Sequence, residues 1–368
     1  MRVMAGFVAA GLAALIVTAA VTLSGVYDVA ATKPHFAIIR WWLELGMRRS
    51  VQFHAASIAV PRLGDPAQVT RGFRHVQTGC LICHSARGLP LSPTVWRLQP
   101  AAPDLAETAP TWAPNELFWI VKHGIKMTGM PAWEAQQRDD EVWDVVAFLQ
   151  ALPGLAPAQL EEMSRRDESE AAVRVTNGRL VVLAGPPQKA EAACVRCHGL
   201  DGAGHPNGAF PRLSGLDESY LLAALRQYAG GVRPSGFMAP VARALSEEEM
   251  RLVAKHYAAM PARGAPSRPA DPALLQQGAA LAAAGAPARG IAACVDCHGH
   301  AGVGTPRAPA LAGQYADYVS RQLSLWKTGR RHDPDDVMGR IARRMTEADI
   351  RAAASYFAAL PGESAVSE

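Results

Sequence analysis

All six cysteines of this 368-residue chain stand in three short motifs of one form. In each motif two residues separate a pair of cysteines, and a histidine directly follows the second cysteine. The motifs consist of Cys80, Cys83 and His84; Cys194, Cys197 and His198; and Cys294, Cys297 and His298. No cysteine remains for a disulfide or a lone thiol, so all six serve one kind of chemistry.

Two thiols about one helical turn apart, with an imidazole next to them, suit the covalent attachment of haem. The thiols form thioethers with the porphyrin vinyl groups, and the histidine supplies a nitrogen to the iron. A thioredoxin-type redox pair needs no histidine after every motif. A zinc site pairs two CxxC motifs about 15–20 residues apart, whereas successive motifs here start 114 and 100 residues apart. The sequence therefore predicts three covalently bound haem c groups, with one iron each.

A methionine after each motif is the candidate for the second axial ligand of the iron, because a soft thioether suits ferrous iron. Met238 and Met338 each lie 40 residues after the motif histidine. After the first motif Met127 and Met130 compete, but only Met130 precedes a proline by 23 residues, as Met238 and Met338 do. We therefore predict three His/Met pairs as iron ligands: His84 with Met130, His198 with Met238, and His298 with Met338.

An iron with both axial positions filled has no site for oxygen or peroxide. It changes oxidation state with little change in geometry, which favours electron transfer over catalysis, and we predict no catalytic residue. A haem peroxidase is the alternative from another class of protein. It would require one iron with a labile or missing methionine, which rapid binding of cyanide or carbon monoxide would reveal.

The segments that carry these residues recur three times and divide the chain. Each closes with a predicted helix followed by a proline, at Arg138–Leu152, Ser246–Met260 and Thr346–Leu360. Duplicated units keep their helices in register and vary in their loops. The predicted division is residues 1–27 (membrane anchor or signal segment), 28–64 (interfacial or connecting helix), 65–154 (first repeat), 155–184 (linker), 185–262 (second repeat), 263–272 (linker) and 273–362 (third repeat).

Side chains on the closing helices are assigned to the core. We expect the closing helix of each repeat to pack on the helix that bears the motif, and its aromatic side chains, Phe148, Tyr257 and Phe357, to lie in the core. Met250, Met260 and Met345 stand among apolar neighbours and are expected to fill the core rather than bind iron. In the linker, Glu161–Glu170 is predicted to be a short helix, and the apolar run Leu180–Leu183 receives no role.

Composition favours an all-α protein, since Ala and Leu dominate and β-branched runs are rare outside the N-terminus. Hydrophobic residues make up 49% of the chain and charged residues 19%, which indicates a folded or anchored protein rather than a disordered one. The net charge of +4 is spread over every segment without a basic stripe, so we expect no nucleic-acid partner.

The N-terminus carries a possible membrane span. Val3–Tyr27 lacks charge over 25 residues, and as a helix it would extend about 37 Å, enough to cross a hydrocarbon core of about 30 Å. A cleaved signal peptide is the alternative, with small residues at Val29–Ala31. A second helix is predicted at Lys33–Ser57, where Trp41 and Trp42 suit either a membrane interface or packing on the first repeat. Whether Val3–Tyr27 is an anchor or a cleaved signal peptide, the chain that follows it is exported.

Each repeat resembles a class I c-type cytochrome domain, and the second and third together resemble the tandem dihaem cytochromes of bacterial respiratory chains. The residues that carry this likeness are Cys194–Gly199, Pro211–Gly215 and Met238–Ser246, and Cys294–Gly299, Pro309–Gln314 and Met338–Thr346. The resemblance implies an all-α fold of three tandem cytochrome domains behind an N-terminal transmembrane helix. It also implies that the carbonyls of Pro211 and Pro309 accept the N–H of His198 and His298. In the first repeat Pro103 is the matching candidate, within a longer loop.

Residues 28–153 are similar to membrane-anchored bacterial cytochromes that share the Gly124–Trp133 segment. The architecture also looks like the cytochrome subunits of periplasmic alcohol, aldehyde and sugar-acid dehydrogenases. This likeness implies a cytochrome in the bacterial inner membrane with its haem domains in the periplasm. The expected partners are a periplasmic dehydrogenase and quinone, or alternatively a terminal cytochrome oxidase that receives the electrons.

Overall fold

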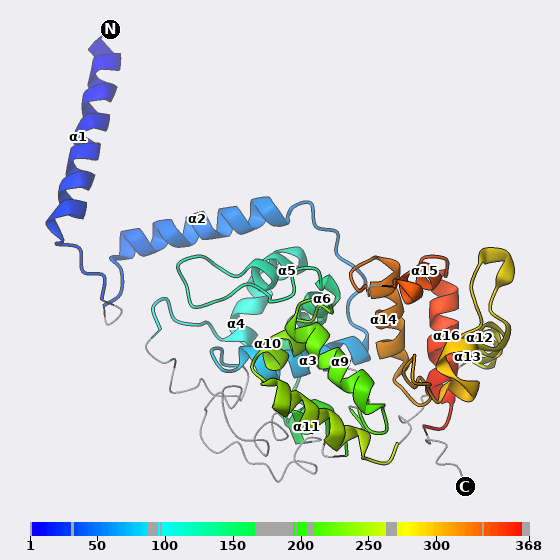
Figure 1. Cartoon of the computed structure of the whole chain (residues 1–368). Coiled ribbons are helices and arrows are strands. Elements are labelled where there is room, and N and C mark those ends of the chain that lie inside the picture. Colours follow the sequence, from blue (N-terminus) through cyan, green and yellow to red (C-terminus); the bar gives the residue numbers. More distant parts are fainter. Residues whose placement is uncertain are drawn as a thin grey trace.

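The structure is a computed structural model, and it describes residues 2–30, 33–86, 95, 98–165, 194–195, 197–199, 201–204, 210–262, 271–332 and 335–362. In this part of the chain the regular elements are helices (Figure 1), and β-structure is limited to isolated bridges such as Ala286 with Ile291. The prediction of an all-α protein is therefore confirmed for the described residues.

The longer helices are α1 (Arg2–Ser24), α2 (Ala37–Ala55), α3 (Pro66–His75), α5 (Pro114–His123), α6 (Asp139–Ala151), α7 (Pro157–Arg165), α9 (Glu218–Ala229), α11 (Glu247–Ala258), α12 (Pro272–Ala284), α14 (Ala316–Lys327) and α16 (Glu347–Ala359). Short helices are α4 (Leu105–Thr108), α10 (Met238–Arg243), α13 (Val295–His298) and α15 (Val337–Ala342), with a π-helical turn at Val76–Cys80 and 3-10 turns at Ala109–Thr111, Leu152–Gly154, Pro287–Arg289 and His300–Gly302.

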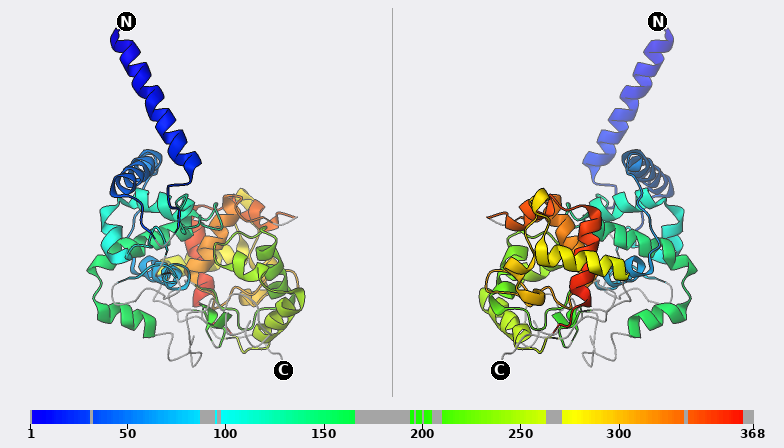
Figure 2. Two further views of the ribbon diagram at one scale, coloured as in Figure 1. Left: turned by 90° about the vertical axis from the view of Figure 1, so that its left-hand side faces the viewer. Right: turned by 90° about the vertical axis from the view of Figure 1, so that its right-hand side faces the viewer.

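Helix α1 stands apart from the rest of the molecule, as Figure 2 shows. Its stretch Gly6–Ser24 has a mean hydropathy of 2.2, and none of it is buried. Among the described residues this is the helix that is long and apolar enough to cross a membrane. A signal sequence near an N-terminus can also form a helix of this kind.

Helix α2 has an exposed half and a packed half. Trp41 and Trp42 are 55% and 67% exposed, whereas Val51 and Ala55 are 1% and 0% exposed. The packed half lies on α5, where the side-chain amide of Asn115 donates to the carbonyl of Ala55 at 2.9 Å. The predicted packing on the first repeat is thus confirmed for the C-terminal half, and the paired tryptophans lie outside that contact.

The buried hydrophobic side chains form three clusters among the described residues. The first lies within residues 51–160, the second within residues 216–257 and the third within residues 281–354. Each cluster thus centres on one repeat, as expected of units that each have a core of their own.

In two repeats the closing helix crosses the helix that precedes the motif at a glycine. Helix α3 packs on α6, where a Cβ on Gly72 would lie 1.9 Å from the carbonyl oxygen of Asp144. Helix α12 packs on α16, where a Cβ on Gly278 would lie 2.2 Å from the carbonyl oxygen of Ala352. Only glycine permits these approaches, and both crossings hold the closing helix against the segment that leads into the motif.

The closing helices of the second and third repeats begin at capping boxes. Ser246 Oγ accepts the Glu249 N–H at 3.3 Å, and the Glu249 carboxylate accepts the Ser246 N–H at 2.8 Å. Thr346 and Asp349 repeat this exchange at 3.1 and 2.7 Å. The reciprocal bonds satisfy two otherwise unpaired N–H groups and place each helix start where the sequence predicts it.

The linker helix starts earlier than predicted. The sequence predicts Glu161–Glu170, but α7 is Pro157–Arg165. Pro157 occupies the first helical position, and the Gln159 side chain accepts the N–H of Ala156 at 2.7 Å. Both features favour a helix start at this point. The run Leu180–Leu183 lies outside the described residues.

Candidate functional site: three histidine motifs along one cavity

The three motif histidines share one hydrogen bond. The Nδ1 atoms of His84, His198 and His298 lie 2.8, 2.9 and 2.8 Å from the carbonyl oxygens of three prolines. These prolines are Pro103, Pro211 and Pro309. A carbonyl only accepts, so Nδ1 carries the proton and Nε2 keeps its lone pair, as a metal-ligating imidazole requires. The expectation for Pro211 and Pro309 is confirmed, and Pro103 takes the same place in the first repeat.

Two of these imidazoles are buried, with His198 at 5% and His298 at 7% exposure. Burial lowers the pKa of both histidines, and the proline carbonyls act in the opposite direction without reversing that change. The neutral imidazole is therefore favoured, which is the form that binds a metal.

The turn after the motif is built alike in the second and third repeats. The N–H of Gly204 donates to the carbonyl of His198 at 2.9 Å, and the N–H of Gly304 donates to the carbonyl of His298 at 2.8 Å. Both glycines have positive φ, at 76° and 91°. The same close approach of backbone thus recurs one repeat later, which supports a duplicated unit.

The closing helix reaches each turn through an aromatic side chain. A Cβ on Gly202 would lie 2.8 Å from the Tyr257 ring, and a Cβ on Gly302 would lie 2.7 Å from the Phe357 ring. Tyr257 and Phe357 are each 1% exposed, which confirms their assignment to the core. The rings of these two side chains contact the turn that follows the motif.

One continuous cavity of about 1940 Å³ connects the three motifs. Its lining includes every predicted site residue: Cys80, Cys83, His84, Met130, Cys194, Cys197, His198, Met238, Cys294, Cys297, His298 and Met338. Pockets for one drug-sized ligand measure about 300–1000 Å³, so this cavity has room for more than one large cofactor. Its size, its largely apolar lining and the orientation of the three imidazoles fit haem.

Burial raises the pKa of the Cys80 thiol to about 12 and that of the Cys294 thiol to about 11. Redox-active dithiols depend on a lowered thiol pKa at one cysteine. The environment of these two cysteines therefore does not favour thiol–disulfide exchange.

The turn after α5 separates the two methionines of the first repeat. Gly124 has a positive φ of 65°, and the N–H of Ile125 donates to the carbonyl of Met130 at 3.2 Å. Met130 lines the cavity and packs partly buried against the first hydrophobic cluster. Met127 is 97% exposed, with a φ of 61°. This geometry favours Met130 as the ligand, in agreement with the 23-residue spacing.

The other two candidate methionines begin short helices rather than lying in extended loops. Met238 is the first residue of α10, and Met338 is the second residue of α15. Both methionines pack partly buried against the hydrophobic cluster of their own repeat. Met250 and Met345 are 6% and 4% exposed on the core side, so their predicted role in packing is confirmed.

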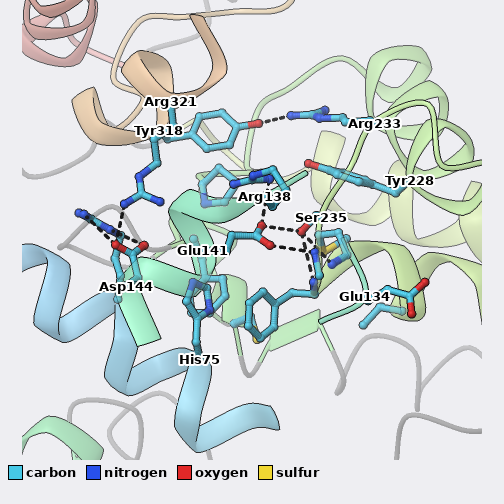
Figure 3. A pocket seen from close by; sticks show the side chains of 18 of the residues that line it. His75, Glu134, Arg138, Glu141, Asp144, Tyr228, Arg233, Ser235, Tyr318 and Arg321 are labelled. Carbon is cyan, nitrogen blue, oxygen red and sulfur yellow. Dashed lines mark hydrogen bonds and ion pairs between the residues drawn. The ribbon is translucent and has the colours of Figure 1, made fainter. Parts of the chain in front are cut away.

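A buried carboxylate joins the first repeat to the third at the edge of the cavity (Figure 3). The Asp144 side chain is 0% exposed and accepts hydrogen bonds from Arg71 at 3.2 Å and Arg321 at 2.8 Å. Arg71 also pairs with Asp317 at 2.7 Å. Burial in a low-dielectric site strengthens such pairs and makes the loss of one partner costly.

A buried arginine joins the second repeat to the third. Arg233 is 3% exposed and donates to the hydroxyls of Tyr220 and Tyr318. Burial alone would raise the pKa of Tyr220, but Arg233 and Arg331 beside it lower that pKa to about 8. Tyr220 and Tyr318 each lie nine residues after the proline that accepts from the motif histidine. Nothing in the sequence pattern pointed to Arg233 itself.

These observations define a c-type cytochrome, and comparison with known proteins agrees. The family described as "Cytochrome C oxidase, cbb3-type, subunit III" matches residues 67–149. The thiosulfate dehydrogenase electron acceptor of Stutzerimonas stutzeri is 42% identical over 187 residues, which cover 50% of this chain and 87% of the relative. Cytochrome c4 of Pseudomonas aeruginosa is 36% identical over 177 residues, 47% of this chain and 86% of the relative.

Among solved structures, a thiosulfate dehydrogenase from Marichromatium purpuratum shares 38% identity, with a TM-score of 0.43 over 46% of this chain and 36% of that chain. The chain belongs to the class I c-type cytochromes, in the family of the thiosulfate dehydrogenase electron acceptors and cytochrome c4. Members of this family carry covalently bound haem c and transfer electrons.

Proposed function

We propose that the chain is a membrane-anchored trihaem cytochrome that relays single electrons in the periplasm. The observation that carries this proposal is the threefold recurrence of one arrangement. In each repeat a histidine bonded to a proline carbonyl lines the same cavity as its two cysteines and a methionine.

The residues that would hold the three groups are those named from the sequence. The cysteine pairs would form the thioethers, and the Nε2 of each histidine would face an iron. The three ligand pairs would be His84 with Met130, His198 with Met238, and His298 with Met338. When bound, haem c supplies a one-electron couple between ferrous and ferric iron.

The chain's own residues define the surroundings of that couple. The proline carbonyls fix the orientation and protonation of the imidazoles, and the hydrophobic clusters around the methionines exclude water. A fixed ligand set means little rearrangement accompanies oxidation or reduction, so the arrangement suits transfer and not catalysis. The peroxidase alternative would need a mobile methionine, whereas Met130, Met238 and Met338 are all packed against hydrophobic clusters.

The number of haem groups can be measured directly. A pyridine haemochrome assay on the purified chain should give three covalent haems per polypeptide. Fewer than three would overturn the proposal. Replacing both cysteines of one motif by alanine should remove one covalent haem, which assigns the haems to the repeats.

As partner we propose a periplasmic dehydrogenase that donates electrons to this chain. The matched length of 187 residues is about that of residues 185–362, so we assign the electron-acceptor likeness to the second and third repeats. The first repeat, where the oxidase-subunit family matches, would pass electrons onward to quinone or to a terminal oxidase. Purification of the tagged chain in mild detergent should recover a dehydrogenase. Recovery of a terminal oxidase without a dehydrogenase would instead favour a role as electron donor to that oxidase.

We further propose that α1 is retained as an anchor in the inner membrane. Its uncharged length supports this, together with the exposed Trp41 and Trp42 on the next helix. Mass spectrometry of the protein from membranes should find α1 intact, whereas cleavage near Ala30 would show a signal peptide.

A further inference from the structure

One carboxylate in the interior contacts the methionine segments of two different repeats. Glu141, on α6 of the first repeat, is 4% exposed and lines the cavity (Figure 3). Its four donors come from two sides. Trp133 Nε1 and Arg138 Nη1 belong to the first repeat and lie 3.2 and 2.9 Å away. Ser235 Oγ and Gly236 N belong to the second repeat and lie 3.1 and 2.9 Å away.

The contact continues from Glu141 to the start of α10. The single hydroxyl proton of Ser235 is directed at Glu141, so the lone pairs of that oxygen face the chain that follows. They accept the N–H of Phe237 at 3.3 Å and the N–H of Met238 at 3.2 Å. The helix α10 therefore starts from an oxygen whose orientation is fixed by a carboxylate of another repeat.

Packing supports the same contact. A Cβ on Gly236 would lie 2.4 Å from Trp133 Nε1, so residue 236 must be glycine for the two chains to approach. The Phe237 ring stacks on His75, with centroids 4.0 Å apart. The segment that leads into Met238 is thus held on both faces by residues of the first repeat.

We propose that Glu141 is a positioning residue for Met238, so that the first repeat fixes the axial ligand of the second haem. The inference rests on the proposed role of Met238 as an iron ligand. Met130 has its own support, because its N–H donates to Thr128 Oγ1 at 3.1 Å and its carbonyl accepts from Ile125. Loss of Glu141 should therefore affect the second haem and spare the first.

The test measures the Met-to-iron absorption band and the affinity of each haem for cyanide in the full chain with its haems attached. The difference spectrum between wild type and Met238→Leu first assigns the band of the second haem. Glu141→Ala and Ser235→Ala should each raise cyanide affinity at that haem about 10- to 100-fold, because buried hydrogen bonds to a charged group are lost. Glu141→Gln keeps one acceptor oxygen and should fall between Glu141→Ala and wild type.

The matched control is Glu134→Gln. Glu134 also reaches α10 from the first repeat, through an exposed ion pair with Arg243, but does not contact the segment before Met238. The Glu134→Gln substitution should leave the Met-to-iron band and the cyanide affinity of the second haem unchanged. The effects of Glu141→Ala and Ser235→Ala should not add in the double variant, since both break one connection.

The outcomes separate the two proposals. If Met238→Leu leaves all bands intact, the ligand assignment is wrong and the proposed function must be revised. If Met238→Leu removes one band but Ser235→Ala, a small change that keeps the fold, leaves that haem unaltered, Glu141 does not position Met238. Equal effects of Glu134→Gln and Glu141→Ala would likewise overturn the inference.

Discussion

The substitution Met130→Leu separates the two methionines of the first repeat most cleanly. Leucine has nearly the volume of methionine and cannot bind iron, and such swaps in a packed site cost less than about 1.5 kcal/mol. Met130 is only partly buried against its cluster, so the fold should survive. The sulfur ligand of the first haem would be lost.

The expected effect of Met130→Leu on the reduction potential of the first haem is larger than its effect on the stability of the fold. Axial ligands and their surroundings set haem potentials over a range of about 0.8 V. We therefore expect the potential of the first haem to fall by on the order of 100 mV, equivalent to about 2.3 kcal/mol for one electron. Potentiometric titration followed at the visible absorption bands of reduced haem should show the potential of one haem shifted and those of the other two unchanged, and the Met-to-iron band of the shifted haem should be lost.

Met127 supplies the control for this experiment. At 97% exposure, Met127→Leu should change stability by less than about 0.5 kcal/mol and leave all three potentials in place. Because Met127 has a φ of 61°, Met127→Gly should stabilise the turn by about 1 kcal/mol. A shifted potential in Met127→Leu with none in Met130→Leu would refute both the spacing argument and the geometric one.

Two further substitutions, Gly278→Ala and Asp349→Asn, test the third repeat, and Gly46→Ala on α2 is the control for the first of them. Gly278→Ala places a methyl group 2.2 Å from the Ala352 carbonyl oxygen and should destabilise the repeat by about 3 kcal/mol. Gly46→Ala lies in open space on α2 and should stabilise its helix by about 0.5–1 kcal/mol. Thermal melts of both variants measure the two changes. The hydrogen bond from Arg289 holds the pKa of Asp349 below its ordinary value of 3.8. The stabilisation that the ionised Asp349 gives the fold is therefore present above pH 3.8 and is lost as the pH falls further. Asp349→Asn should cost about 1 kcal/mol at pH 7, with the difference from wild type shrinking on acidification below 3.8, and a difference independent of pH would contradict this.

Local chemistry made much of the fold predictable. The closing helices of the second and third repeats begin at Ser246 and Thr346 because a hydroxyl three residues before a carboxylate forms a capping box, a pattern visible in four residues of sequence. Met130 was preferred over Met127 from spacing to a proline alone, and the turn geometry points the same way. These features depend on neighbours within about one turn or on comparison of one repeat with another.

The contacts between repeats could not be predicted in this way. Glu141 meets Gly236 across 95 residues and Arg321 meets Asp144 across 177, and no periodicity links positions so far apart. Charged residues on a helix such as α6 would ordinarily be assigned to a solvated face. They are buried here because another repeat covers that face, which is information that only the tertiary structure contains.

The ion pairs between Asp144, Arg71 and Arg321 have a consequence for kinetics. Soluble cytochromes meet their partners by diffusion, and charge attraction makes those encounters sensitive to ionic strength. Here the first repeat is already docked on the third through charges shielded from solvent, where salt screens weakly. In the proposed relay, exchange of electrons between the haems of one chain should therefore proceed at a rate independent of salt, and any salt dependence of turnover would belong to the encounter with an external protein.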